Sequence, residues 1–479
     1  MAVKLVLLSG GSGKRLWPMS NDIRSKQFLR VLSTEVGEPM SMLQRVWTQL
    51  DEAGLRENAY ICASRTQLDV IEAQIGQASF IEEPARRDTF PAISLASAYL
   101  WDVEMAADDD IVVIMPIDPY VDSEFFSSLK ILPRVLMESD AEMVLMGVRP
   151  TEPSSKYGYI CVEPGFQADS ARGWKRVTSF VEKPARDAAE QLAAEGSLWN
   201  CGVFCFRLGY MKRVLNERGL PLSYRKLSEA FSSLPKRSFD YEVVEQASSI
   251  VVHPFSGLWT DLGTWGSLSQ RITDRFIGKG RQFQCEDTHV INELGIPLLT
   301  IGLRDAIVVA TPDGILVADK EMSPHIKELV APFEGRPMFE ERLWGMYRVM
   351  DYQELSDGTE VLTRWIELLP GHNLSYHKHE RRAEMWTILE GSGEVAVDGR
   401  LVQVAAGDVV RIYPEQWHAI RAHDKLAFIE VQRGAEVVEH DIVRRYHTWA
   451  EIVDYLAVTG GLRSVDAAAS MKAGSVTPA

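Results

Sequence analysis

The sequence predicts an α/β domain with a mostly parallel sheet, then a small β-rich domain and an all-β barrel. Two observations predict this order. In the first half, apolar runs that suit buried strands alternate with amphipathic stretches. In the last third, many short strand-like runs are separated by glycine turns. The length of 479 residues suits two or three domains.

Four apolar runs in the first half are the strand candidates, and two amphipathic stretches are helix candidates. The runs cover residues 3–8, 59–63, 111–115 and 142–148, and the amphipathic stretches cover 41–50 and 91–105. Alternating strands and helices form a sheet covered by helices. We therefore predict an α/β domain over residues 1–270, which binds ligands beyond the carboxyl ends of its strands.

The pattern changes after residue 270. Residues 289–319 hold short β-like runs around the turn Pro312-Asp313-Gly314, which predicts a β-rich linker domain over residues 271–335. Residues 330–344 are rich in Pro, Glu and Arg, and we interpret them as an inter-domain linker. An all-β barrel is predicted over residues 336–456. Residues 457–479 are small and polar, which predicts a flexible tail.

Charge and composition limit the classes of partner. The net charge of −16 argues against nucleic-acid binding, so a phosphate ligand must be held by a local group of cations. Hydrophobic residues make up 46% of the chain, but no segment has the length of a membrane span. The five cysteines form no Cys-x-x-Cys pair, and the first residues do not resemble a signal peptide. We expect a cytoplasmic protein without a membrane partner.

The first strand candidate ends in a glycine-rich loop, SGGSGKR, at residues 9–15. A Walker A motif needs glycine where Leu8 stands and Ser or Thr where Arg15 stands. The dinucleotide-binding fingerprint fails because Leu16 replaces its third glycine. What remains is a turn whose backbone N–H groups can approach phosphate, followed by Arg15 and by Lys14 or Lys26 as cations. The alternative is a plain strand-to-helix turn with solvated cations.

Seven motifs in register carry a resemblance to a known family. Besides residues 10–18 with 26–28, the motifs are residues 83–93, 156–160, 180–184, 199–204, 238–245 and 259–265. They resemble sugar-phosphate nucleotidylyltransferases, and more closely bacterial mannose-1-phosphate guanylyltransferases. The resemblance implies a Rossmann-like domain in which a sugar 1-phosphate attacks the α-phosphorus of a nucleoside triphosphate. The expected substrates are GTP and mannose 1-phosphate, and the products are GDP-mannose, a precursor for polysaccharide biosynthesis, and pyrophosphate.

The resemblance also implies roles for individual residues. The catalytic residues would be Arg15, Lys26, Asp118 and Asp261, of which Asp118 and Asp261 would hold Mg²⁺. The nucleotide-binding residues would be Leu8, Gly10, Gly11, Gly13, Arg15, Arg87 and Asp88. The sugar-phosphate-binding residues would be Gly158, Glu182, Lys183 and Asn200. A helix is expected after Asp88, with Thr89 as its cap.

Other interpretations of these residues stay open. Asp118 suits a turn before Pro119, Asp261 suits an Asx turn, and Glu182 with Lys183 suits a surface ion pair. The chain has Asp88 and Phe90 where the family usually has Asn and Ala, so another base, or another sugar 1-phosphate such as a manno-heptose, is the alternative substrate.

The predicted barrel contains a candidate metal site. His377 and His379 are two residues apart and share one face of a strand, Glu384 follows five later, and His418 lies in the next segment. Gly371, His377, His379, Glu384 and Gly391 match the first cupin motif, while Gly407 and His418 match the second only in part. Three imidazoles and a carboxylate suit a divalent transition metal such as Zn²⁺.

The barrel resembles that of type II mannose-6-phosphate isomerases, which implies a cupin jelly roll and leaves the activity open. His377 stands where that isomerase usually shows Gln, and Glu380 and Arg381 interrupt its histidine run. The alternative is a non-catalytic barrel that binds a sugar or joins subunits. We expect a homo-oligomer, a dimer, with a nucleoside triphosphate and a sugar 1-phosphate as ligands and no nucleic acid.

Overall fold

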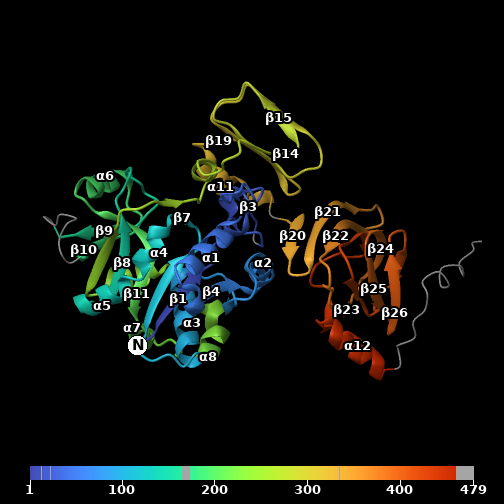
Figure 1. Ribbon diagram of the computed structural model, residues 1–479, viewed down its shortest axis with the longest axis horizontal. Coiled ribbons are helices and arrows are strands. Elements are labelled where there is room, and N and C mark those ends of the chain that lie inside the picture. The colour runs from blue at the N-terminus through green and yellow to red at the C-terminus, as the bar shows by residue number, and fades with distance from the viewer. Residues whose placement is uncertain (12, 22, 164–172, 334, 460–479) are drawn as a thin grey trace, which may run out of the picture.

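The computed structural model describes residues 1–11, 13–21, 23–163, 173–333 and 335–459. Figure 1 shows an α/β domain and a β barrel side by side, with a small β domain above the α/β domain. Among the described residues, no helix is both long and apolar enough to cross a membrane. The last helix, α12 (Trp449–Val458), extends two residues into the predicted tail, and residues 460–479 lie outside the described residues.

A nine-stranded sheet forms the centre of the α/β domain, in the order β5-β4-β1-β6-β11-β8-β12-β10-β9. Its strands are β1 (Val3–Leu8), β4 (Ala59–Ser64), β5 (Ser79–Glu83), β6 (Ile111–Pro116), β8 (Met143–Val148), β9 (Tyr159–Val162), β10 (Lys175–Val181), β11 (Leu198–Arg207) and β12 (Ile250–Phe255). The pairings give β10 and β11 the opposite direction to the other strands. The four predicted strands are confirmed. Most strands of the sheet run in one direction, as predicted, but every pairing made by β10 or β11 is antiparallel, so the sheet is mixed.

Helices cover both faces of this sheet. They are α1 (Met42–Glu52), α2 (Arg65–Ile75), α3 (Thr89–Asp102), α4 (Ser123–Leu129), α5 (Leu132–Ser139), α6 (Arg186–Ala194), α7 (Leu208–Glu217), α8 (Tyr224–Ala230), α9 (Phe239–Glu242) and α10 (Trp265–Ser269). In β1, Leu5 and Leu7 pack with α1, α2, α4 and α5, whereas Val6 and Leu8 pack with α3, α7 and α8. A strand buried on both faces requires the continuous apolar run that predicted it.

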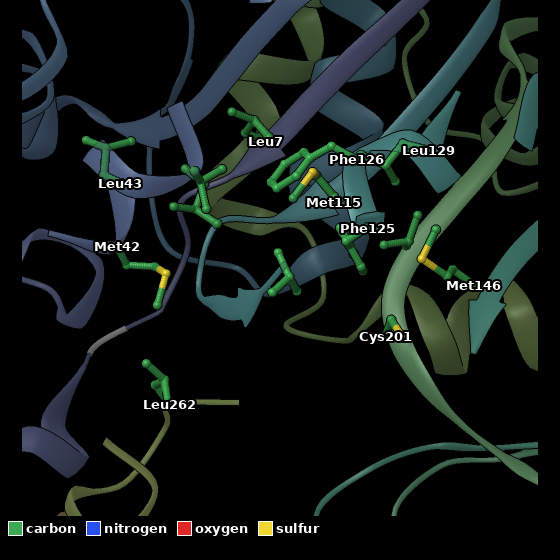
Figure 2. Close-up of a cluster of buried hydrophobic side chains, with 14 of the residues drawn as sticks. Leu7, Met42, Leu43, Met115, Phe125, Phe126, Leu129, Met146, Cys201 and Leu262 are labelled. Atoms are coloured by element: carbon green, nitrogen blue, oxygen red, sulfur yellow. The ribbon is translucent and has the colours of Figure 1, made fainter. Parts of the chain in front are cut away.

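Figure 2 shows part of the first of these two cores. Leu7 of β1, Met115 of β6 and Phe125 and Phe126 of α4 lie in one cluster. Leu262, which follows Asp261, is buried at the edge of the same core. The packed core therefore anchors the backbone at the carboxyl ends of the strands, where the candidate site lies.

A small antiparallel ribbon crosses that end of the sheet. It consists of β7 (Pro119–Val121) and β13 (Trp259–Asp261), and its register places Asp261 opposite Pro119. A second ribbon is formed by β2 (Leu32–Ser33) and β3 (Pro39–Met40). The β7–β13 ribbon brings two distant parts of the sequence to the same edge of the sheet.

The small domain has a four-stranded sheet, β14-β16-β18-β19, and a two-stranded sheet, β15-β17. Its elements are β14 (Phe276–Gly278), β15 (Gly280–Phe283), β16 (His289–Asn292), β17 (Leu298–Ile301), β18 (Ala306–Thr311), β19 (Gly314–Asp319) and α11 (Ile326–Leu329). Because α10 ends at Ser269 and β14 begins at Phe276, the boundary predicted near residue 270 falls between two elements.

The C-terminal domain is an antiparallel barrel of two sheets, in the orders β20-β21-β22-β29-β24-β27 and β26-β25-β28-β23-β30. Its strands are β20 (Phe339–Arg342), β21 (Gly345–Glu354), β22 (Glu360–Leu368), β23 (Tyr376–Lys378), β24 (Arg382–Glu390), β25 (Ser392–Val397), β26 (Arg400–Ala405), β27 (Val409–Ile412), β28 (His418–Ala422), β29 (Leu426–Gly434) and β30 (Val443–Tyr446). This confirms the predicted all-β barrel.

The interpretation of residues 330–344 as a linker is wrong for β20. This strand pairs with β21, and it also contacts α2 of the α/β domain. Its sequence, Phe-Glu-Glu-Arg, lacks an apolar alternation because the buried position is Glu340, which is 2% exposed and forms an ion pair with Arg342. A buried ion pair hid the strand from a hydrophobicity pattern.

Candidate active site and candidate metal centre

Two carboxylates and one ammonium meet where the β7–β13 ribbon crosses the sheet. Asp118 lies directly before β7, and Asp261 ends β13. The Nζ atom of Lys26 lies 2.5 Å from Oδ2 of Asp118 and 3.3 Å from Oδ1 of Asp261. The structure thus brings three predicted catalytic residues to one point.

The charge of Lys26 is stabilised by this arrangement. Burial opposes the charge, but the carboxylates of Asp118 and Asp261 outweigh it and hold the pKa of Lys26 well above its ordinary value. Both carboxylates aim at one cation position, which the ammonium fills. Oxygen ligands that converge in this way fit the preference of Mg²⁺ for carboxylates.

A cavity of about 600 Å³ opens beside this cluster. Its walls are formed by the ends of β1 and β6, the start of α3, and the segments that carry the predicted sugar-phosphate-binding residues. The predicted site residues that line it are Leu8, Gly10, Gly11, Arg87, Asp88, Asp118, Gly158, Glu182, Asn200 and Asp261. The cavity therefore lies beyond the carboxyl ends of the strands, as predicted.

The glycine loop follows β1 at the mouth of this cavity. Gly11 has a φ of 120°, which favours glycine. Gly13 has a φ of 60°, and a Cβ atom there would lie 3.0 Å from the backbone nitrogen of Lys26. Gly13 therefore lets the loop pack against the segment that carries Lys26.

Arg15 lines a second cavity, of about 1070 Å³, between the α/β domain and the linker domain. The two cavities share Lys156, Tyr157, Trp259 and Asp261 as walls. The exposed Arg15 can reach a polyanion from the larger cavity, while Gly10 and Gly11 line the first cavity.

Asp88 caps the helix that follows it. Its carboxylate accepts a hydrogen bond from the backbone nitrogen of Thr89 at 2.8 Å, and α3 begins at Thr89. The expectation that Thr89 is the cap is wrong, because its hydroxyl instead accepts from the backbone nitrogen of Phe239 at 2.8 Å. Arg87 donates to the carbonyl of Ser232.

Gly158 and Glu182 lie in close contact. A Cβ atom on Gly158 would be 2.5 Å from Oε2 of Glu182 and 2.6 Å from the ring of Phe180. The next residue, Lys183, is 55% exposed and forms an ion pair with Glu182. Burial opposes the charge of Lys183, but Glu182 raises its pKa, so the ammonium stays charged beside the cavity.

Asp240 also lines the cavity and was not among the predicted site residues. It accepts a hydrogen bond from Nδ2 of Asn200 at 2.7 Å, while Oδ1 of Asn200 accepts one from the backbone nitrogen of Gly202 at 3.1 Å. Burial, followed by the charge of Glu182, raises the pKa of Asp240 to about 7. The signal for it was present, because Asp240 lies inside the motif at residues 238–245.

Three aromatic rings also line the cavities, Tyr157 and Trp259 on the wall that the two share and Trp199 in the larger one, and none was among the predicted site residues. The ring of Tyr157 lies 4.6 Å from that of Trp199 and 5.4 Å from that of Trp259. Burial, followed by the charge of Asp261, raises the pKa of Tyr157 to about 12, so its hydroxyl is a neutral donor. A lining that combines aromatic rings with the carboxylates of Glu182 and Asp240 suits the mixed surface of a sugar.

The barrel brings its three predicted histidines together. The β23–β28 register places His377 opposite His418, and one ligand atom each from His377, His379 and His418 lies within 4.8 Å of the others. All three side chains are buried, and so is Glu384 on the facing sheet. Burial, followed by the neighbouring His418 and His379, holds the pKa of His377 well below its ordinary value, so this imidazole is neutral.

The hydrogen bonds of the histidines fix which nitrogen points inward. Each Nδ1 atom lies against a backbone carbonyl, His377 with Ser375 at 2.6 Å, His379 with Asp441 at 2.5 Å, and His418 with Gln416 at 2.9 Å. A carbonyl only accepts, so each Nδ1 carries the proton and each Nε2 offers a lone pair. Nε2 of His418 is buried without a hydrogen-bond partner among the described residues.

Glu384 completes the donor set. Its carboxylate oxygens lie 3.0 Å from Nε2 of His379 and 3.5 Å from Nε2 of His418. Arg382 lies beside this set, with Nη2 3.3 Å from Nε2 of His379 and Nε 3.2 Å from Oε1 of Glu384. Three imidazole nitrogens and a carboxylate gathered in this way fit the donor set of a divalent metal ion.

Comparisons with known proteins identify the α/β domain and the barrel. The family model described as Nucleotidyl transferase matches residues 4–275. The model described as Mannose-6-phosphate isomerase C-terminal matches residues 338–447. The first match spans more than half of the chain, so the chain belongs to the nucleotidyl transferase family.

Within this class, the chain is similar over most of its length to mannose-1-phosphate guanylyltransferases. It is 29% identical to that of Escherichia coli and 30% identical to RfbM of Salmonella typhimurium, covering 92% of this chain and 97% and 96% of those proteins. The crystal structure of mannose-1-phosphate geranyltransferase from Thermus thermophilus has a TM-score of 0.58 at 27% identity, over 70% of this chain and all of that one.

Proposed function

We propose that this enzyme transfers the guanylyl group of GTP to mannose 1-phosphate, giving GDP-mannose and pyrophosphate. The observation that carries the proposal is the cluster of Lys26, Asp118 and Asp261, whose two carboxylates line a cavity that the glycine loop also lines. The similarity to mannose-1-phosphate guanylyltransferases supports the choice of substrates.

The reaction joins two polyanions. An oxygen of the sugar phosphate attacks the α-phosphorus, the bond from that phosphorus to the bridging oxygen breaks, and pyrophosphate leaves with both electrons of that bond. The chain's own part is to neutralise charge and align the two phosphates. The glycine backbone and Arg15 hold the triphosphate, Lys26 contacts the transferring phosphate, and Lys183 pairs with the sugar phosphate.

Asp118 and Asp261 would hold Mg²⁺, which would supply a hard positive charge to neutralise the phosphates. The ammonium of Lys26, which lies between these carboxylates, would then turn to the phosphate. Glu182 and Asp240 would accept hydrogen bonds from sugar hydroxyls. Asn200 would hold Asp240 in place, since the side-chain amide of Asn200 already has partners on both atoms.

The test is a panel assay. The protein is incubated with GTP, ATP, CTP or UTP and with mannose, glucose or manno-heptose 1-phosphate, and pyrophosphate release is measured. GTP with mannose 1-phosphate should react fastest. A faster reaction with another pair would replace the proposed substrates, and no release with any pair would refute the proposal.

The histidine cluster favours a second candidate function for the barrel, the interconversion of mannose 6-phosphate and fructose 6-phosphate. His377, His379, His418 and Glu384 would hold a divalent transition metal such as Zn²⁺, which would act as a Lewis acid toward a sugar oxygen. The test is fructose 6-phosphate formation from mannose 6-phosphate by the metal-loaded protein. No conversion would leave the barrel a non-catalytic sugar-binding or subunit-joining module.

We further propose a cytoplasmic homodimer. All five cysteines are free thiols, which a reducing compartment maintains. The two-stranded β15–β17 sheet exposes Phe283, Leu299 and Ile301 by 60%, 64% and 61%, and a sheet this small needs a partner to be stable. Sedimentation velocity should give a dimer, and Leu299→Ser with Ile301→Ser should give a monomer. A monomeric wild-type protein would refute the dimer.

A further inference from the structure

The linker domain packs against the loop that joins β1 to Lys26. The indole of Trp17 stacks on Phe333 at a ring distance of 6.1 Å and packs against Gly314. The hydroxyl of Thr311 donates to the carbonyl of Pro18 at 3.4 Å. The residues of the active-site loop are thus packed against a domain that contributes no catalytic residue of its own.

The strongest of these contacts is an ion pair between Arg24 and Glu293. Nη1 and Nη2 of Arg24 donate to the two carboxylate oxygens of Glu293 at 2.9 and 2.8 Å. The pair is largely buried, with side-chain exposures of 17% and 28%, and the guanidinium lies 5.0 Å from the ring centre of Phe339 in β20. A bidentate, partly desolvated pair of this kind restricts both direction and distance.

Glu293 is itself held rigidly. It directly follows β16, and its backbone nitrogen donates to the carbonyl of Ala310 in β18 at 2.8 Å. The side chain of the preceding residue, Asn292, donates to the carbonyls of Lys279 and Ile296 at 2.8 Å each. Arg24 is therefore fixed to a sheet and not to a movable loop.

Arg24 and Lys26 are two residues apart, so the position of Arg24 constrains the backbone of Lys26. The carboxamide oxygen of Asn21 accepts from the backbone nitrogen of Arg24 at 2.7 Å. Ser25, between the two cations, accepts from Nε2 of Gln67 at 2.9 Å, and Gln27 donates to Ser9 at 2.9 Å. The backbone on both sides of Lys26 is thus held in place. Among the described residues of this stretch, only Arg24 forms an ion pair with the linker domain.

We propose that Arg24 and Glu293 are positioning residues for nucleotidyl transfer. The proposal rests on the proposed transferase reaction and adds a role for the linker domain in it. In the reaction the ammonium of Lys26 must turn from Asp118 and Asp261 to the phosphate while it stays close to the two carboxylates. A small shift of the Lys26 backbone therefore has a large effect on the rate. The ion pair sets that backbone position from outside the α/β domain.

The first test is kinetic. With the pair of substrates that wild type turns over fastest, Arg24→Ala should lower kcat about tenfold or more, with both KM values within about threefold of wild type. The nearly isosteric Glu293→Gln should lower kcat in the same way, which covers the case that Arg24→Ala unfolds. The matched control is Arg30→Ala, which removes the more exposed ion pair from Arg30 to Glu341 and should leave kcat within about twofold.

A double-mutant cycle separates positioning from a general structural role. If Arg24 acts through Lys26, then Arg24→Ala should change the residual rate of Lys26→Ala by less than about twofold. An equal loss of kcat in both backgrounds would overturn the proposal, and so would wild-type kcat in Arg24→Ala and Glu293→Gln.

A second measurement does not depend on turnover, so it stands even if no substrate pair reacts and the proposed function fails. Acylation of Lys26 by an amine-reactive reagent is followed by mass spectrometry in the full-length protein. Arg24→Ala and Glu293→Gln should raise the rate about threefold or more, because the displaced ammonium loses its carboxylate partners. An unchanged rate in both variants would overturn the proposal.

Discussion

Asp240 accepts a hydrogen bond from the side-chain amide of Asn200 over 2.7 Å, at the wall of the cavity that Glu182 also lines. The bond joins α9 to β11, two elements that the sequence separates by about 40 residues. The bond uses one of the two N–H donors of the Asn200 amide, so both Asn200 and Asp240 keep hydrogen-bonding capacity toward the cavity that they line.

The raised pKa of Asp240 predicts a pH-dependent stability. Its pKa is about 7 in the folded protein against an ordinary value of 3.8, so between these values the folded state binds more protons than the unfolded state. The contribution of Asp240 to the stability of wild type therefore falls as pH rises through this window. Asp240→Asn removes the effect, so the Tm difference in favour of the variant should be larger at about pH 8 than at about pH 5.

The same comparison for the exposed Asp274→Asn should show no such trend. A Tm difference for Asp240→Asn that is the same at both pH values would contradict the assigned burial of its charge.

Asp261→Asn should weaken the magnesium site. The variant keeps the shape of the side chain but removes one of the two negative charges that converge on Lys26. We expect kcat for pyrophosphate release to fall about a hundredfold and the half-saturating Mg²⁺ concentration to rise. Titration of the rate with Mg²⁺ measures both, and near-wild-type rates at every concentration would remove Asp261 from the metal site.

Lys183→Ala should act on one substrate only. Loss of a charge-assisted hydrogen bond costs about 1.5–3 kcal/mol, so KM for the sugar 1-phosphate should rise about tenfold or more while KM for the triphosphate stays unchanged. Steady-state kinetics with each substrate varied in turn measures this, with the exposed Lys226→Ala as control. Equal changes in both KM values would refute the assigned role.

Gly158→Ala tests the close approach of backbone to Glu182. The added methyl would lie 2.5 Å from Oε2 of Glu182, so Glu182 or the strand must move. We expect KM for the sugar 1-phosphate to rise and stability to fall by about 1–3 kcal/mol. Gly295→Ala is the matched control, because a Cβ atom there meets no heavy atom within 4 Å. If both variants behaved alike, the contact would have no role.

His377→Ala with His379→Ala should strip the metal from the barrel. Two of three convergent Nε2 atoms are lost, and metal content measured by mass spectrometry should fall to background. The α/β domain lies apart from this centre, so pyrophosphate release should stay within about twofold of wild type (Figure 1). His423→Ala, at a partly exposed histidine, should keep the metal, and unchanged metal in the double variant would disprove the assigned metal site.

Much of the fold could be predicted because burial leaves a mark along the chain. β1, β6 and β8 are apolar at nearly every position since both faces of their sheet are covered. The motif at residues 83–93 placed Asp88 immediately before a helix. β20 escaped because its inward residue, Glu340, is charged and paired with Arg342.

The candidate site was predicted residue by residue from the motifs, and the roles of those residues remain predictions. Asp240 could have been predicted in the same way, because it lies within the motif at residues 238–245. The Arg24–Glu293 pair was not, because neither residue belongs to a local pattern that names its partner.

By itself, the sequence determined which segments become strands and which residue types gather in the motifs, because periodicity and composition act over a few neighbouring residues. Only the tertiary structure decided which of them meet. The β7–β13 register sets Asp261 beside Asp118, and the β23–β28 register sets His377 beside His418. Such contacts join distant parts of the chain, and their geometry is fixed by strand pairing and core packing that no local pattern records.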